Sequence, residues 1–407
     1  MATFLLIMIY LAFISLGLPD SLLGAAWPVM RGDLDAPLAS AGWIGMIVSA
    51  GTIVSSLVGG KLTDRLGVGK IAFISSLLTA SALLGMGLSP SLFWLFLLAV
   101  PLGIGAGAVD SGLNHYVSLN YKAHHMSWLH CFWGVGATLG PILMSYAIDS
   151  RDSWRDGYTG VALIQFLLAA ALLVTLPLWR RAGGQTHEMA AAAAPEEMPG
   201  ETGGRPLRIP GVPYALLAFL FYCAAETTVG LWGGSYLVNV RGMEPGQAAR
   251  WVSLYYAGIT AGRFLTGFAT LRIGNRTLIR AGQAAALAGA ALLLLPLPDG
   301  LSPIGLVLIG LGFAPIFPCM LHETPARFGK KASGAIMGYQ MAVAYTGSTL
   351  FPPLLGWIAS HAGIGIFPYF LAAYALLMLL SSEKLNHLIG KRRAAGIIPP
   401  GGDGLAG

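Results

Sequence analysis

The sequence predicts an all-α polytopic membrane protein with twelve transmembrane helices arranged in two six-helix bundles. The 407 residues are 55% hydrophobic and only 10% charged. The apolar runs are about 20 residues long, which is the length that a helix needs to cross the hydrocarbon layer. These runs do not alternate between apolar and polar residues, as the strands of a membrane barrel do. Several features recur after about 207 residues, which indicates two related halves.

Each half contains six apolar segments long enough to span a membrane. In the first half we expect spans at about 3–30, 40–60, 70–89, 91–118, 126–149 and 158–179. In the second half we expect spans at about 211–238, 249–271, 277–297, 301–321, 333–360 and 363–382. Gly17 and Pro19 can kink or unwind the first span, which is tolerated where a helix lines a cavity.

The halves are joined by a segment of small, polar and charged residues, which is typical of a linker. We therefore predict an N-terminal bundle at 1–180, a cytoplasmic linker at 181–210, a C-terminal bundle at 211–383 and a cytoplasmic tail at 384–407. Most Lys and Arg residues fall on one side of the membrane when the N-terminus is placed inside. We expect a monomer in the inner membrane with both termini in the cytoplasm.

The net charge of +6 does not indicate nucleic-acid binding, because the basic residues lie in short loops between spans. The three cysteines, Cys131, Cys223 and Cys319, all lie inside apolar spans. Their odd number and apolar surroundings favour packing over a disulfide or a metal site. The first span starts almost at Met1 without a basic region or a cleavage site before it, so we interpret it as a retained helix.

Acidic residues inside the spans are the strongest functional signal. Asp20 lies in Gly17-Leu-Pro-Asp-Ser-Leu-Leu-Gly24, and Glu226 opens the similar run Glu226-Thr-Thr-Val-Gly230 in the seventh span. A carboxylate in hydrocarbon costs several kcal/mol, so an intramembrane acid is by default a candidate for function. Matching acids in two related halves favour a transporter built from repeats. The alternative is an acid that only ties neighbouring helices together.

Asp110 is the third intramembrane acid, and Asn114 follows it by four residues on the same helix face. A carboxyl group that is shielded from water can bind and release a proton near neutral pH, which proton coupling requires. We therefore predict that Asp110, Asp20 and Glu226 take part in proton coupling. The glycines at 103, 105 and 107 favour close helix packing over nucleotide binding, because no strand precedes them.

The loop after the second span, Gly60-Lys61-Leu62-Thr63-Asp64-Arg65-Leu66-Gly67-Val68-Gly69-Lys70, recurs weakly as Gly267-Phe-Ala-Thr-Leu-Arg-Ile-Gly274. It closely resembles the loop 2–3 signature of the major facilitator superfamily. The resemblance covers the whole chain at the level of topology and implies two bundles that rock about a central cavity. It also implies gating roles, as a cytoplasmic latch, for Gly60, Asp64, Arg65, Gly67 and Lys70.

A narrower resemblance lies in the fourth and fifth spans. The run from Gly105 to Val117, with Asp110 and Asn114, is similar to the acid-x-x-x-Asn signature of the fucose/galactose/glucose–proton symporter family. His130-Cys-Phe-Trp133-Gly-Val-Gly136 resembles the fifth helix of that family. The family acid is usually Glu, and amide side chains stand at the positions of His130 and Trp133. The resemblance implies substrate contacts by Asp20, Asn114, His130 and Trp133.

Further residues complete the predicted cavity. Sugars are bound by polar groups and by aromatic faces, so Trp133 and Trp232 are candidate stacking partners, with packing as the alternative for both. Arg263 is predicted to pair with an acid or a carbonyl group near the inner surface as part of the gate, and an anionic substrate is its competing partner. The other candidates for substrate binding are Glu226, Asn239, Gln340 and Tyr345.

The leading hypothesis is a secondary active transporter that imports a small polar solute, most plausibly a hexose, together with a proton. Export of a drug-like or sugar-like compound in exchange for protons is the alternative. A membrane receptor or an enzyme is the third hypothesis, and no nucleophile–base pair, phosphate loop or zinc motif supports an enzyme. The expected partners are a small-molecule substrate and the lipid bilayer, with no nucleic acid, no metal and no cofactor besides the coupling proton.

Overall fold

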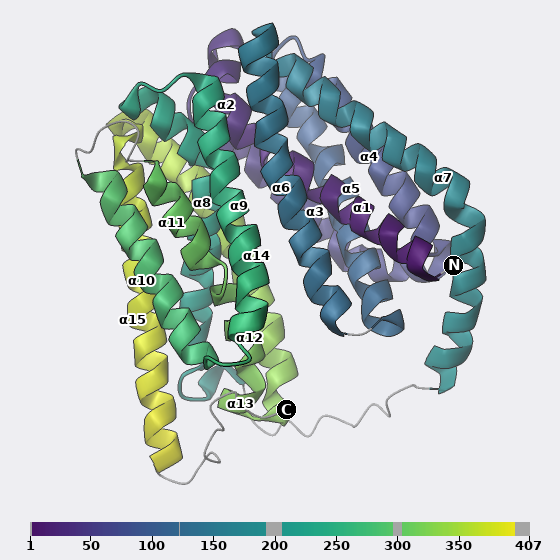
Figure 1. Cartoon of the computed structure of the whole chain (residues 1–407), viewed down its shortest axis with the longest axis vertical. Coiled ribbons are helices and arrows are strands. Elements are labelled where there is room, and N and C mark those ends of the chain that lie inside the picture. Colours follow the sequence, from purple (N-terminus) through teal and green to yellow (C-terminus); the bar gives the residue numbers. More distant parts are fainter. Residues whose placement is uncertain (1, 122, 193–205, 296–302, 395–407) are drawn as a thin grey trace. The chain divides into compact units, whose positions relative to one another are not determined.

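A computed structural model describes residues 2–121, 123–192, 206–295 and 303–394. All regular structure in these residues is helical (Figure 1). Ten helical segments among them are long and apolar enough to cross a membrane. Two more long helices, α9 (Pro245–Ala269) and α14 (Lys330–Ala362), lie at the predicted eighth and eleventh spans. The prediction of an all-α polytopic membrane protein is confirmed.

The chain divides into two compact units. The N-terminal unit comprises Met1–Met198 and Leu237–Ser253, and the C-terminal unit comprises Pro199–Tyr236 and Leu254–Gly407. The helices of the first half are α1 (Ala2–Asp20), α2 (Leu22–Asp33), α3 (Ser40–Leu66), α4 (Val68–Gly87), α5 (Leu92–Asn120), α6 (Ala123–Arg151) and α7 (Trp154–Ala192).

The second half begins with a 3-10 turn at Pro206–Arg208, and a second such turn lies at Ile364–Ile366. Besides α9 and α14, its helices are α8 (Val212–Arg241), α10 (Asn275–Leu294), α11 (Ile304–Phe313), α12 (Ile316–His322), α13 (Thr324–Phe328) and α15 (Phe367–Ala394). Helices α8 and α9 each contribute residues to both units.

The predicted boundaries of bundles, linker and tail stay predictions. Helix α7 continues past residue 180 to Ala192, so the first residues of the predicted linker are helical. Residues 193–205 lie outside the described part of the chain. Helix α15 likewise continues past residue 383 to Ala394, beyond the predicted start of the tail.

Two of the predicted spans are broken helices. The first span consists of α1 and α2, which are separated at Ser21, directly after Pro19 and Asp20. The tenth span consists of α11 and α12, which are separated at Ala314 and Pro315. Proline has no N–H for the helical ladder and disturbs the preceding turn, which explains both breaks. The first break leaves Asp20 as the last residue of α1.

Gln165 compensates for the hydrogen bond that Pro19 cannot make. In a regular helix the N–H of residue 19 donates to the carbonyl oxygen of Ser15, and proline has no such N–H. Gln165 Nε2 on α7 donates to that Ser15 oxygen at 2.8 Å. Thr79 Oγ1 on α4 in turn donates to Gln165 Oε1 at 2.6 Å. This buried chain of hydrogen bonds joins α1, α4 and α7 without leaving the freed carbonyl group unsatisfied.

Glycines allow α1 and α6 to pack at backbone distance. A Cβ atom on Gly17 would collide with the carbonyl oxygen of Trp133, and one on Gly136 would collide with that of Ile14. A Cβ on Gly140 would lie 2.6 Å from the carbonyl oxygen of Leu18. Small residues permit this approach in membranes, where helices gain stability from close packing. The contact brings Trp133 on α6 next to the end of α1.

Candidate functional site

Asp20 and Trp133 form a hydrogen-bonded pair in the N-terminal unit. Trp133 Nε1 donates to Asp20 Oδ2 at 2.8 Å, across the glycine contact between α6 and α1. Asp20 is exposed as a residue, and Trp133 is half-buried. Asp20 therefore has one oxygen held by an indole N–H while its side chain still reaches accessible space. The oxygens of this carboxyl group can accept hydrogen bonds from the hydroxyl groups of a ligand.

Asp110 and Asn114 form a second pair on α5. Asn114 Nδ2 donates to Asp110 Oδ1 at 2.9 Å and to the Asp110 carbonyl oxygen at 3.0 Å. Both side chains are half-buried. Asp110 lies close enough to Asp20 for the two carboxyl groups to interact electrostatically. The structure thus brings together four residues that the sequence analysis selected from α1, α5 and α6.

His130 lies one turn before Trp133 on α6 and faces the same neighbouring helix. Its ring meets Phe13 of α1 edge-on, with centroids 6.1 Å apart, and its side chain is exposed. Trp133 packs against the apolar core of the N-terminal unit, of which Phe13 and Leu129 are members. The candidate site therefore lies at the border between this core and accessible space.

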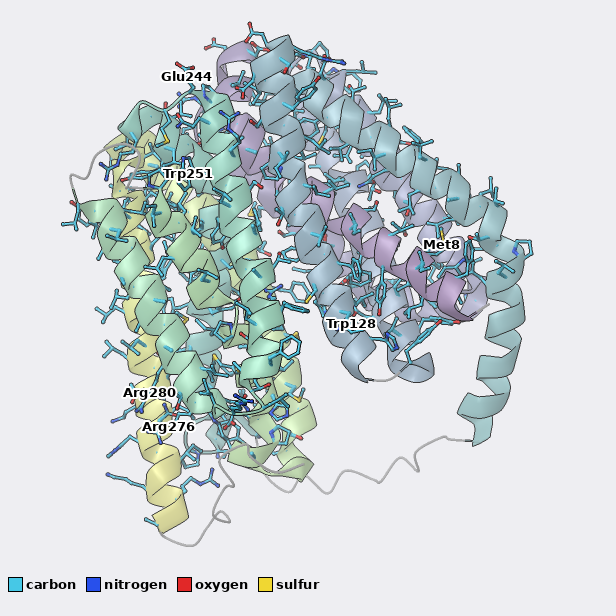
Figure 2. All side chains as sticks on the ribbon, viewed as in Figure 1. Met8, Trp128, Glu244, Trp251, Arg276 and Arg280 are labelled. Atoms are coloured by element: carbon cyan, nitrogen blue, oxygen red, sulfur yellow. The ribbon has the colours of Figure 1, made fainter. Side chains whose placement is uncertain are left out.

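The sequence analysis missed an aromatic group beside the site. Tyr10 Oη and His125 Nδ1 are 2.7 Å apart, and the ring of Tyr10 stacks on Phe132 with centroids 4.4 Å apart. His125 also meets Trp128 edge-on near the first turns of α6, where Figure 2 labels Trp128. The i, i+3 spacing of His125 and Trp128 was the available signal in the sequence, and nothing local connected it to Tyr10.

The acid of the second half has a different partner. Glu226 Oε1 on α8 accepts a hydrogen bond from Arg263 Nη2 on α9 at 3.2 Å, and both side chains are largely buried in the C-terminal unit. Arg263 Nη2 also donates to Tyr222 Oη at 3.4 Å. The pairing of Arg263 with an acid agrees with the expectation from the sequence. The sequence did not identify Glu226 as that acid.

Comparison with known protein families identifies the family of this chain. Residues 9–352, well over half of the chain, match the family model described as Major Facilitator Superfamily. The chain belongs to the Major Facilitator Superfamily. Among solved structures, the inward-open xylose transporter XylE from E. coli aligns with a TM-score of 0.73 at 13% identity, covering 95% of this chain and 96% of that one. As a member of this superfamily, the protein is a membrane transporter and not an enzyme.

Relatives of this chain include two named transporters, each of which is 24% identical to it. The cis,cis-muconate transport protein of Acinetobacter baylyi is 24% identical over 88% of this chain and 87% of its own length. The glucose/mannose transporter GlcP of Bacillus subtilis is 24% identical over 72% of this chain and 73% of its own. The narrower resemblance to the fucose/galactose/glucose–proton symporters stays a prediction at this level of similarity.

The superfamily loop has the backbone that its glycine predicts. Gly67 joins α3 to α4 with φ +83°, a backbone conformation that residues other than glycine rarely adopt. Arg65 and Lys70 on either side of it are exposed. The side chain of Asp64 and the exposure of Gly60 lie outside the described part of the structure. The gating role of this loop therefore stays a prediction.

Trp232 and Gln340, which we predicted to line the cavity, are packed inside the C-terminal unit. Trp232 has no exposed surface, and its Nε1 donates to the Pro352 carbonyl oxygen at 2.8 Å. Gln340 is 1% exposed and accepts a hydrogen bond from Thr324 Oγ1 at 3.0 Å. A solute has no surface to contact on either side chain, so neither belongs to the candidate site in this structure.

The remaining predicted residues are not brought to either cluster by a described contact. Asn239 is exposed near the C-terminal end of α8, in the stretch that groups with the N-terminal unit. Tyr345 is exposed on α14 of the C-terminal unit. Their roles in substrate binding stay predictions.

Proposed function

We propose that this transporter carries a hexose, or a closely similar small polar solute, together with a proton by alternating access. The observation that carries the proposal is the pair formed by Asp20 and Trp133, with the pair formed by Asp110 and Asn114 beside it. Sugars present many hydroxyl groups and one apolar ring face. Carboxylate, amide and indole groups that line accessible space are suited to both features.

Proton coupling is assigned in the first place to Asp110. Asp110 is half-buried and interacts electrostatically with Asp20, and two carboxylates repel each other when both are ionised. One proton shared between these sites relieves the repulsion. A change in the accessibility of the pair during the transport cycle then changes its occupancy by a proton, which links proton binding to solute binding.

The proposal also includes the membrane in which the protein lies, its oligomeric state and its orientation. We place it in the inner membrane as a monomer with both termini in the cytoplasm, supported by the distribution of basic residues in the loops. The proton is the only coupling ion that it requires, and no cofactor takes part. The relative named as a glucose/mannose transporter supports a hexose as the solute.

The experiment is uptake into proteoliposomes with a panel of labelled hexoses, with and without an imposed pH gradient. We expect one or more hexoses to accumulate only when the outside is acidic relative to the inside. Extrusion of preloaded solute when protons flow in the opposite sense would instead support the alternative, a proton-driven exporter. Absence of any gradient-driven hexose movement would refute the proposal.

A further inference from the structure

We infer that the cluster of Glu226 and Arg263 in the C-terminal unit is a carboxylate-binding site, so that this transporter also carries acidic six-carbon sugar derivatives, such as an aldonate or a hexuronate. The inference rests on the proposed function and extends its substrate class. It uses only residues of α8 and α9 within the C-terminal unit.

Arg263 is held in a way that leaves its acidic partner replaceable. The side chains of Arg263 and Glu226 keep 17% and 16% of their surface exposed, and one guanidinium nitrogen contacts one carboxylate oxygen at 3.2 Å. A forked, two-point contact gives arginine–carboxylate pairs their greatest strength. An incoming carboxylate that makes the forked contact would compete with Glu226 for Arg263.

One tyrosine hydroxyl group contacts the ion pair, and two more lie on the same two helices nearby. Tyr222 Oη accepts from Arg263 Nη2 at 3.4 Å and is also hydrogen-bonded to Glu226. Tyr255 Oη donates to the Glu226 carbonyl oxygen at 3.0 Å. Gly230 leaves room for the hydroxyl group of Tyr256, which a Cβ atom at this position would meet. A hydroxyl group donates to one oxygen or accepts from a guanidinium as needed, so it accommodates either occupant.

The charge balance of the cluster predicts what happens to Glu226. The titratable and charged groups that face it are Tyr222 and Cys223 on its own helix and Tyr255, Tyr256 and Arg263 on α9. Of these groups, Arg263 alone is charged at neutral pH. When a substrate carboxylate takes Arg263, Glu226 loses its counter-charge inside a largely buried site, where an uncompensated carboxylate is costly. Glu226 then takes up one proton from the aqueous side, and the net charge of the cluster is unchanged.

This exchange adds one proton to each acidic solute that is carried. A neutral hexose leaves the ion pair intact, so its proton count is that of the Asp110 site alone. An acidic hexose brings one negative charge and one more proton. The two kinds of solute therefore move the same net charge per molecule while differing by one proton.

The test compares D-glucose, D-gluconate and D-glucitol in proteoliposomes, with pH gradient and membrane potential set independently. D-Glucitol keeps the carbon chain of gluconate and replaces the carboxylate with a hydroxyl group. We expect gradient-driven uptake of gluconate, with one more proton per solute than glucose. Arg263→Gln should lower gluconate uptake at least about tenfold, because a charge-assisted contact is lost. Glu226→Gln should keep gluconate counterflow but lose the additional proton.

Arg280→Gln is the matched control. Arg280 of α10, labelled in Figure 2, also pairs with a glutamate of the same unit, Glu383. These two side chains keep 45% and 38% of their surface exposed. This variant should transport gluconate like the parent. Thermal stabilisation of the unmodified protein by gluconate and not by glucitol gives a second measurement that needs no variant.

The outcomes separate this inference from the proposed function. Accumulation of glucose without transport or binding of gluconate would overturn the inference and leave the proposed function standing. Unchanged gluconate uptake in Arg263→Gln, or equal proton counts for the two solutes, would also overturn the inference. Absence of gradient-driven accumulation for every hexose, neutral or acidic, would overturn both.

Discussion

Asp110 is the residue whose chemistry is most directly open to test. Asparagine in its place mimics the protonated carboxyl group, keeps the contact with Asn114 and removes the titratable proton. We expect Asp110→Asn to retain counterflow of the solute and to lose accumulation driven by a pH gradient. Asp20→Asn should impair solute binding as well, because Asp20 presents an exposed carboxylate. A variant Asp110→Asn that still concentrates solute like the parent would move the coupling proton to another acid.

Trp133 is predicted to act through its indole N–H as well as through its ring. Phenylalanine keeps an aromatic face but cannot donate to Asp20 Oδ2. The N–H group orients the Asp20 carboxylate that we propose to contact the solute, so Trp133→Phe should raise the half-saturation concentration for hexose uptake, by up to about tenfold if the energy of a charged hydrogen bond is lost from the solute complex. Trp43→Phe, at an exposed tryptophan of α3, is the control. Equal half-saturation in both variants would argue against a role for the N–H group.

The sequence identified individual residues of the site better than their partners. Asp20 and Trp133 stand out as polar and aromatic groups inside apolar spans, but their pairing depends on how α1 and α6 are rotated about their axes. The same limit applies to Trp232, which the structure buries. Its place in the seventh span was correct, and the orientation of its indole toward Pro352 is a property of helix packing that no local pattern records.

At the scale of elements, Gln165 and Pro19 are predicted to be energetically coupled. Gln165→Leu removes the donor to the Ser15 carbonyl group, which Pro19 cannot satisfy. The loss should destabilise the protein by about 1–2 kcal/mol, the cost of an unsatisfied buried polar group. In a Pro19→Ala background the helix can supply that N–H itself, so Gln165→Leu should then cost less. Melting temperatures of the two single variants and the double variant give the coupling energy.

The contact between α1 and α6 gives a second prediction for elements. Gly17→Val places a branched side chain against the backbone of Trp133, where no space is available. The helices must separate, so we expect a lower melting temperature and impaired hexose uptake together. Gly160→Val on α7 meets nothing within 4 Å and should change neither property appreciably. Similar losses in both variants would show that helix propensity, and not the close contact, is responsible.

The existence of the helices followed from the sequence because about 20 apolar residues in a membrane admit few alternatives. The kink expected at Gly17 and Pro19 is present as the break between α1 and α2. The break between α11 and α12 was not anticipated, although Pro315 stands in the tenth span. One proline in an apolar run is compatible with either a bend or a break, and neighbouring helices decide between them.

At the scale of the whole molecule, the matching acids of the two halves have different hydrogen-bond partners. Asp20 in the first half is held by an indole N–H, whereas Glu226 at the matching place in the second half is held by a guanidinium. The first acid interacts electrostatically with Asp110, and the second is paired with a cation. On our proposals the first cluster serves hydroxyl groups and protons and the second serves a carboxylate, each within its own unit.

Membrane orientation is the property of the whole molecule that the sequence predicts from charge alone, and cysteine labelling tests it. Glu244 and Lys384 are exposed at positions predicted to face the outside and the cytoplasm. Cys223 and Cys319 are buried, and Cys131→Ser removes the half-buried cysteine. In that background a membrane-impermeant maleimide should label Glu244→Cys in intact cells and Lys384→Cys only in inside-out vesicles. The reverse pattern would invert the membrane orientation and place both termini outside.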